Sequence, residues 1–517
     1  MIRHPRSRAS ALALTSFAVS AFLGLSLAAA GSPNLCGPTG RWTSTGGRSP
    51  VAVADYLSTL GDQRFDLRAA CALWARSYSN RRHAAAAGNS ASKPPPPRLI
   101  LFPSPGTSQP QLVDWLKRTG YVRDIERAGH FVVAIFSRHI PTARLRDILG
   151  APQIEYAEPD CDGPDFLTTS TENFTASPTS KCWRRAARNE FPNDPCMDEL
   201  WGHQKIGWNS AVAARSLPRL VAILDSGIDA THEDLALNVM PRIDPHEPPR
   251  SQGSLLNARC AMSGRCYPHG TEMAGTIGGR MDNGIGIAGV APNSRLVPIV
   301  ISRVGHGLLA RLSTIAEGID AAVLDDVDVI NISAKWPVDS RAISESVLAA
   351  VGGDAARKRL VVTGYATSLD SDDSVREYFP SQYRCLPGVL AAVPTDMRGH
   401  DLFNPEGRPD PKDGRIQAPG VDIVVTTSEN SDRGYILSGS AGASSAAAYV
   451  SGAVALVWGS PPLNKCDAQQ IKQLLFCRSK ISDSTRYPWV HVDFLRELSN
   501  LDPGADCHTA MEWLGCG

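Results

Sequence analysis

The stretch Leu220-Val-Ala-Ile-Leu-Asp-Ser-Gly227 joins an apolar, partly β-branched run to an acidic turn. A short apolar run without polar alternation is typical of a strand buried on both faces of a parallel sheet. A carboxylate at the carboxyl end of such a strand lies where α/β sheets bind ligands, and glycine lets the chain turn sharply behind it. The stretch therefore predicts a buried strand ending in a candidate functional residue, Asp225, although the same tripeptide is also a common surface turn.

Four more runs of this kind follow, separated by segments with helical spacing such as 309–324. They are Arg295–Ile301, Val327–Ile332, Arg359–Val362 and Gly388–Val393. Strands that alternate with helices predict an α/β domain with a doubly wound, mostly parallel sheet. We assign this domain to residues 196–500.

Residues 98–160 form a smaller unit that precedes this domain. Strand-like runs at 98–102, 131–136 and 154–160 alternate with helical patterns at 109–119 and 142–149. This order predicts a small α+β, ferredoxin-like fold.

The N-terminal thirty residues are typical of a secretory signal peptide. A basic start is followed by an apolar run at 11–27 and by Ala28-Ala29-Ala30. A membrane anchor is the alternative, but the apolar run is near the lower length limit for a spanning helix. We expect a secreted, extracellular protein with no membrane span after signal removal.

Three further segments complete the domain organisation. Residues 31–97 form an N-terminal module and a linker that ends in four prolines, and such a linker is stiff and exposed. Residues 161–195 are polar and predict an exposed processing segment, with a glycosylation sequon at Asn173. Residues 501–517 are a cysteine-containing tail.

Charge and cysteine content narrow the classes of partner. The 517 residues include 52 basic and 52 acidic side chains, so charge gives no reason to expect nucleic acid as a partner. The twelve cysteines fit an oxidising compartment. Zinc is the alternative, but no Cys-x-x-Cys occurs. We expect local disulfides between near neighbours in the sequence, namely Cys260–Cys266, Cys466–Cys477 and Cys507–Cys516.

Two more segments contain residues suited to catalysis. His269-Gly-Thr precedes a small-residue helical pattern, and histidine can act as general acid and base near neutral pH, although it is also a common structural residue. Ser444 follows Gly442-Ala443 and begins another small-residue helical pattern. A hydroxyl at a helix N-terminus lies near free N–H groups that can stabilise an oxyanion, although capping the helix is its commoner role.

These three segments, in the order Asp225, His269, Ser444, resemble the signatures of the subtilisin-like serine peptidases, and this order differs from that of other serine hydrolases. The resemblance covers roughly residues 196–500. It includes segments in family order at Asp229–Leu235, Gly286–Pro292, Val329–Ser333, Phe379–Ser381 and Ala418–Gly420. The resemblance implies a secreted serine endopeptidase with Ser444 as nucleophile, His269 as general acid–base and Asp225 as the residue that orients His269, forming an acyl-enzyme intermediate on protein or peptide substrates.

Residues 98–160 are similar to the inhibitory propeptide of that family, so the resemblance implies an autoinhibited precursor. An unrelated module of the same shape is the alternative. No cofactor is required for this chemistry. The family often binds structural calcium, and the matching residues here are Asp234, Asn283, Ile285 and Ile287, with Asp198 as a candidate further ligand. These residues offer oxygen ligands that suit Ca²⁺. Solvated loops are the alternative.

The sequence departs from the family pattern near the active site. Thr367 stands where the family has an oxyanion-hole asparagine, and losing such a donor costs on the order of 100- to 1000-fold in rate. The expected substrate pocket is formed by Ser333, Ala334, Lys335, Trp336 and Tyr365, whose bulky members would narrow or fill it.

These departures keep a second hypothesis open, a catalytically impaired pseudopeptidase that acts as a binding or regulatory protein. A lipase or esterase is the third hypothesis, but this chain lacks the Gly-x-Ser-x-Gly turn of that class, and its triad residues occur in a different order.

Overall fold

The computed structural model describes most of the chain from the end of the proline-rich linker onward. The described residues are 53, 57, 65–67, 69–71, 96–161, 187–240, 268–301, 310–336, 339–365, 367–369, 375–402, 414–428, 434–438, 442–479 and 488–517. The predicted signal peptide, most of the N-terminal module, the sequon at Asn173, and Cys260 and Cys266 lie outside them.

The larger unit is built on a six-stranded sheet in the order β12-β11-β8-β7-β5-β6, with every pair of neighbours parallel. Its strands are β5 (Leu220–Asp225), β6 (Arg295–Val300), β7 (Val329–Ile332), β8 (Leu360–Gly364), β11 (Val389–Thr395) and β12 (Arg415–Pro419). Each of the five apolar runs of the sequence forms one of these strands. The prediction of a doubly wound α/β domain with a parallel sheet is therefore confirmed.

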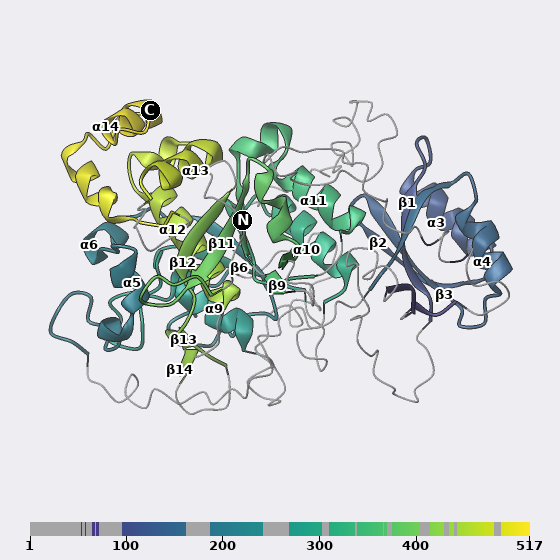
Figure 1. The fold of residues 1–517 in the computed structure, drawn as a ribbon, viewed down its shortest axis with the longest axis horizontal. Coiled ribbons are helices and arrows are strands. Elements are labelled where there is room, and N and C mark those ends of the chain that lie inside the picture. The colour runs from purple at the N-terminus through teal and green to yellow at the C-terminus, as the bar shows by residue number, and fades with distance from the viewer. Residues whose placement is uncertain are drawn as a thin grey trace, which may run out of the picture.

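Helices cover both faces of this sheet (Figure 1). One face packs against α9 (His269–Gly278) and α12 (Ala443–Gly459), and the other against α10 (Leu312–Leu324) and α11 (Arg341–Val351). Successive strand residues point to opposite faces. In β5, Val221 and Ile223 accordingly join the first core, whereas Ala222 and Leu224 join the second.

Shorter elements surround the two cores. They are η2 (Met197–Glu199), α5 (Trp201–Lys205), α6 (Ser210–Ala213), η4 (Gly353–Arg357), η5 (Ser381–Cys385), η7 (Leu463–Lys465), α13 (Ala468–Cys477), η8 (Asp493–Asn500) and α14 (Cys507–Trp513). Two antiparallel hairpins join β9 (Thr367–Leu369) to β10 (Val375–Glu377), and β13 (Ile423–Thr426) to β14 (Tyr435–Ser438). No helix of the described residues is long and apolar enough to span a membrane.

The smaller unit, residues 98–160, lies at one end of the molecule beside α10 and α11 (Figure 1). Its elements are β1 (Arg98–Pro103), α3 (Gln109–Arg118), β2 (Val122–Ala128), β3 (Phe131–Phe136), α4 (Thr142–Leu149) and β4 (Ile154–Pro159). The four strands form an antiparallel sheet in the order β2-β3-β1-β4. Sequence analysis missed β2 because this edge strand is largely charged and exposed. The ferredoxin-like assignment of this unit stays a prediction.

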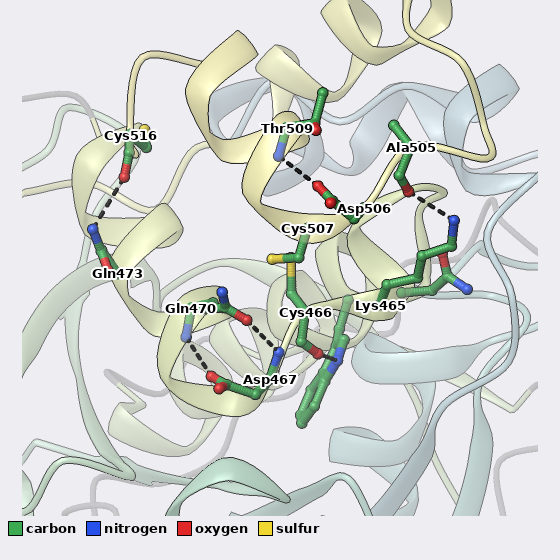
Figure 2. Close-up of a disulfide and its surroundings, with 12 residues drawn as sticks. Lys465, Cys466, Asp467, Gln470, Gln473, Ala505, Asp506, Cys507, Thr509 and Cys516 are labelled. Atoms are coloured by element: carbon green, nitrogen blue, oxygen red, sulfur yellow. Dashed lines mark hydrogen bonds between the residues drawn. A yellow bond between two sulfur atoms is a disulfide. The ribbon is translucent and has the colours of Figure 1, made fainter.

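The C-terminal tail folds back onto α13, and its disulfides differ from those expected. Cys466 pairs with Cys507, and Cys477 pairs with Cys516. Figure 2 shows the first bond, beside which Lys465 Nζ donates to the carbonyl of Ala505 (2.7 Å). The local pairs Cys466–Cys477 and Cys507–Cys516 are wrong, because each of these four cysteines bonds to a cysteine of the other expected pair. Between Cys466 and Cys477 the chain forms α13, whose rise of about 1.5 Å per residue holds the two Cα atoms beyond the reach of a disulfide.

Candidate active site

Asp225 and His269 are in direct contact at the carboxyl edge of the large sheet. Asp225 is the last residue of β5, and His269 is the first residue of α9. His269 Nδ1 lies 2.9 Å from Asp225 Oδ1 and 2.8 Å from Oδ2. Both side chains are buried. Because Nδ1 is hydrogen-bonded to Asp225, Nε2 on the other side of the ring is the nitrogen that can exchange a proton with a nucleophile.

Small residues allow α9 to approach β5 so closely. A Cβ at Gly270 would lie 2.2 Å from the carbonyl oxygen of Gly227 and 3.1 Å from Asp225 Cβ, so only glycine fits there. The Gly270 N–H donates to Ser226 Oγ (3.0 Å), and the Ser226 N–H donates to Asp225 Oδ1 (2.6 Å). The Asp-Ser-Gly and His-Gly motifs thus hold each other in place.

The electrostatic surroundings of His269 favour its protonated form. Burial by itself would lower the pKa of His269. The negative charge of Asp225, the hydrogen bond to its carboxylate and the negative charge of Glu272 act in the opposite direction, and the pKa of His269 is raised overall. The site can therefore stabilise an imidazolium, which a general acid–base must become during acyl transfer.

Ser444 lies at the same edge of the sheet, in the first turn of α12. Its Oγ donates a long hydrogen bond to the carbonyl oxygen of Ser333, 3.4 Å away, directly after β7. A Cβ at Gly364 would lie 2.7 Å from the carbonyl oxygen of Ala443, so the end of β8 packs tightly against this turn. Since β7 lies beside β5, the structure brings Ser444 to the edge that carries Asp225 and His269.

A buried chain of two serine–asparagine hydrogen bonds links α12 to the end of β7. Ser451 Oγ donates to Asn331 Oδ1 (2.9 Å), and Asn331 Nδ2 donates to Ser333 Oγ (2.9 Å). This chain of hydrogen bonds runs from the middle of α12 to the residue whose carbonyl accepts from Ser444. Sequence analysis did not single out Ser451, because a serine two helical turns after Ser444 carries no signal of its own.

The predicted oxyanion residue follows the end of β8. Thr367 is the first residue of β9 and pairs with Glu377 of β10. Its position close behind Gly364 in the chain is compatible with the prediction, and its role as an oxyanion donor stays a prediction.

The structure separates the predicted pocket residues. Tyr365 packs with Ala391 and Val393, and its hydroxyl accepts from Arg415 Nη1 at 3.5 Å. Alternation along the strand directs Tyr365 to the sheet face opposite to that of Gly364, which contacts α12. The pocket role of Tyr365 stays a prediction.

The remaining pocket residues follow β7. The backbone of Trp336 exchanges two hydrogen bonds of 2.9 Å with Phe379, and its side chain is buried in the core shared with α10 and α11. Ala334 is buried in the same core, whereas Lys335 Nζ lies 5.2 Å from the ring centre of Tyr378. Asn331 alternates in β7 with the core residues Ile330 and Ile332 and therefore lies on the sheet face that packs against α12.

The residues predicted to bind calcium are arranged as a hydrogen-bonded cluster. The buried Asp234 carboxylate accepts from Asn283 Nδ2 (2.7 Å), the Ile287 N–H (3.0 Å) and the Tyr435 hydroxyl (2.9 Å). Asn283 Oδ1 accepts from the Ile285 N–H (3.1 Å). Three hydrogen-bond donors thus point at the Asp234 carboxylate, the group that would have to coordinate a cation.

The fifth predicted ligand, Asp198, is exposed and pairs with Arg188 at 2.9 Å. No group of three or more His, Cys, Asp or Glu side chains in the described part of the chain could hold a metal ion. Hydrogen-bond donors occupy the Asp234 carboxylate and Arg188 pairs with Asp198, so no role is derived for calcium, and the calcium site stays a prediction.

Comparison with known proteins agrees with this architecture. A sequence model described as the subtilase family matches residues 219–486, about half of the chain. Subtilisin from Bacillus pumilus is 32% identical over 245 residues, which are 47% of this chain and 77% of the relative. Subtilisin E from Bacillus subtilis (strain 168) is 31% identical over 245 residues, and the match spans only 56% of its length.

The fold is also similar to a solved structure. It is the crystal structure of fervidolysin from Fervidobacterium pennivorans, a keratinolytic enzyme related to subtilisin. The two share 22% identity with a TM-score of 0.55, over 77% of this chain and 60% of the other. This likeness extends beyond the region matched in sequence and concerns the fold alone.

Proposed function

The chain belongs to the subtilase family and is a subtilisin-like serine endopeptidase, and we propose that Ser444, His269 and Asp225 are its catalytic triad. The observation that carries the proposal is the pair of contacts between His269 Nδ1 and the Asp225 carboxylate, at 2.9 and 2.8 Å. A buried carboxylate on Nδ1 fixes the ring and stabilises its charged form, which is the arrangement that acyl transfer requires.

In this mechanism Ser444 Oγ attacks the scissile carbonyl of a protein or peptide substrate, and His269 Nε2 takes its proton. His269 then gives that proton to the leaving amine, and water hydrolyses the acyl-enzyme with the same residue acting as base. Asp225 holds the imidazole and does not take up the proton.

The oxyanion that develops on the substrate needs nearby donors. The first turn of α12 supplies free backbone N–H groups, and the positive end of its dipole lies at Ser444. We assign the second donor to the hydroxyl of Thr367, which is shorter than the amide that the family uses at this place.

We also propose that residues 98–160 are an inhibitory propeptide, because two of its carboxylates bind the peptidase domain. Glu158 accepts from Ser340 Oγ (2.7 Å) and from the Arg341 N–H (2.9 Å) at the start of α11. Asp160 accepts from the N–H (3.0 Å) and the hydroxyl (2.9 Å) of Ser313 at the start of α10. Carboxylates are favourable at helix N-termini, so both contacts support a specific complex.

The contact surface between the two units is continuous with the core. Ile100, Phe102 and Phe131 of the small sheet belong to the same buried cluster as residues of α10 and α11. Burial raises the pKa of Glu158 to about 7, which reflects how completely the docked propeptide excludes water from this carboxylate.

Secretion is part of the same proposal. The basic, apolar and small-residue order of residues 1–30 supports export, and the disulfides of the described residues suit an oxidising compartment. The pseudopeptidase alternative is not favoured, since the chain is a serine endopeptidase by its family.

The proposal is tested by hydrolysis of a denatured protein substrate with processed enzyme. We expect Ser444→Ala to abolish turnover, while Ser445→Ala, a matched change at the next residue, keeps it. Equal hydrolysis by the Ser444→Ala variant would show that another group is the nucleophile.

A further inference from the structure

The N-terminal module packs into the core of the propeptide-like unit. Its described apolar residues share one buried cluster with residues from both helices and the sheet of that unit. From the module these are Val53, Leu57, Phe65, Leu67 and Ala70, and from the unit they include Leu99, Leu112, Leu116, Phe136 and Leu145. Arg146 of α4 also donates to the carbonyl of Leu57. The module is therefore part of the propeptide's core, although the proline-rich linker separates the two in sequence.

A disulfide ties the module to the far end of the propeptide. Cys71 pairs with Cys161, 90 residues later and two residues beyond β4. Cys71 packs against two cores, that of the propeptide and the one shared with α10 and α11. Cys161 is buried in the shared core, and its carbonyl oxygen accepts from the Leu312 N–H at 3.2 Å. The disulfide thus lies where the module, the propeptide and α10 meet.

The propeptide's two ends come together at this same place. The Asp160 N–H donates to the carbonyl of Arg98 (3.0 Å), and the Arg98 side chain forms an ion pair with the Asp160 carboxylate. That carboxylate is the one that binds Ser313 of α10. Holding Cys161 next to Cys71 therefore holds the docking carboxylate in its bound position.

We propose that the Cys71–Cys161 disulfide and the module lock the propeptide in its inhibitory position, so that it remains bound after the chain is cut behind it. This inference rests on the proposed function, since it concerns regulation of the same active site. Closing a 90-residue loop lowers the entropy of the unfolded propeptide, and a propeptide that stays folded pays less to rebind. Activity then appears only when the locked propeptide is itself degraded.

The test compares two disulfide variants of the full chain. Cys71→Ser/Cys161→Ser removes the lock, whereas Cys477→Ser/Cys516→Ser removes a disulfide from the C-terminal tail, at the opposite end of the molecule from β1–β4 (Figure 1). The measurements are the lag before peptidase activity and the retention of the N-terminal fragment on the peptidase domain in gel filtration. We expect the first variant to shorten the lag about tenfold or more and to lose the fragment, because it removes the stabilisation that the closed 90-residue loop gives to the folded propeptide. The control variant should keep the wild-type lag and should retain the fragment.

A lag and a fragment retention equal to those of the wild type would overturn the proposal. If the double variant is not secreted, Leu57→Ala loosens the module without touching a cysteine and should shorten the lag less strongly; an unchanged lag for that variant would also overturn the proposal. A serine-directed probe separates failure of the disulfide lock from failure of the proposed peptidase function. Labelling with an unchanged lag contradicts the lock alone, and no labelling of any processed variant contradicts the proposed function.

Discussion

The hydroxyl of Ser451 donates a hydrogen bond of 2.9 Å to Asn331, so the middle of α12 is tied to β7 inside the protein. Both residues are fully buried. Through Asn331 the contact reaches Ser333, whose carbonyl oxygen accepts from Ser444. The position of the nucleophile thus depends on a polar contact well inside the helix.

Ser451→Ala should lower both stability and activity. It leaves the buried Asn331 oxygen without its donor, and we expect the free energy of unfolding to fall by about 1–3 kcal/mol. Urea denaturation measures this, with Ser499→Ala, an exposed serine, as the matched control. A stability change no larger than that of the control would mean that the contact is unimportant.

Glu272→Gln should change the pH dependence of catalysis. The charge of Glu272 is one of the causes that raise the pKa of His269. His269 acts as base only when neutral, so kcat/KM rises as pH rises through this pKa. Removing a charge that raises the pKa of His269 should move the acid limb to lower pH. The test is the kcat/KM profile between pH 5 and 9. An acid limb that stays in place, or moves to higher pH, would contradict this assignment.

The Asp234 cluster should hold without a metal. We expect a chelator to shift Tm by less than about 1 °C, since hydrogen-bond donors already occupy the carboxylate. Tyr435→Phe removes one donor from a buried carboxylate and should cost about 1–3 kcal/mol. Thermal unfolding with and without added Ca²⁺ is the measurement. A Tm that rises by several degrees with calcium would contradict this and support the predicted calcium site.

Thr367→Asn should raise turnover. An amide at this position reaches further than the threonine hydroxyl, and a well-placed oxyanion donor contributes on the order of 100- to 1000-fold. We expect kcat to increase by about tenfold with little change in KM, because the contact forms only in the transition state. An unchanged or lower kcat would mean that another group already fills the role.

The sequence predicted the features that depend on local patterns. The strand ending at Asp225 is apolar throughout because it is buried on both faces, and that property is visible in one chain segment. The contact between Asp225 and His269 could be expected from the order of the motifs.

The features that could not be predicted from the sequence depend on how segments far apart in the chain contact one another. The partners of Cys466 and Cys477 lie in a tail whose path the spacing of cysteines does not encode. The orientation of Tyr365 follows from strand register, and the donors around Asp234 come from β14 as well as from the loop at 283–287. The charged edge strand β2 has no apolar pattern to reveal it.

The most direct test of the triad is the site of reaction with a fluorophosphonate probe, which forms a covalent bond with activated serines. We predict that processed enzyme carries one adduct, that mass spectrometry locates it on Ser444, and that His269→Ala strongly slows its formation because the base is lost. A folded, processed protein that acquires no adduct on Ser444, or acquires it equally fast without His269, would contradict the account.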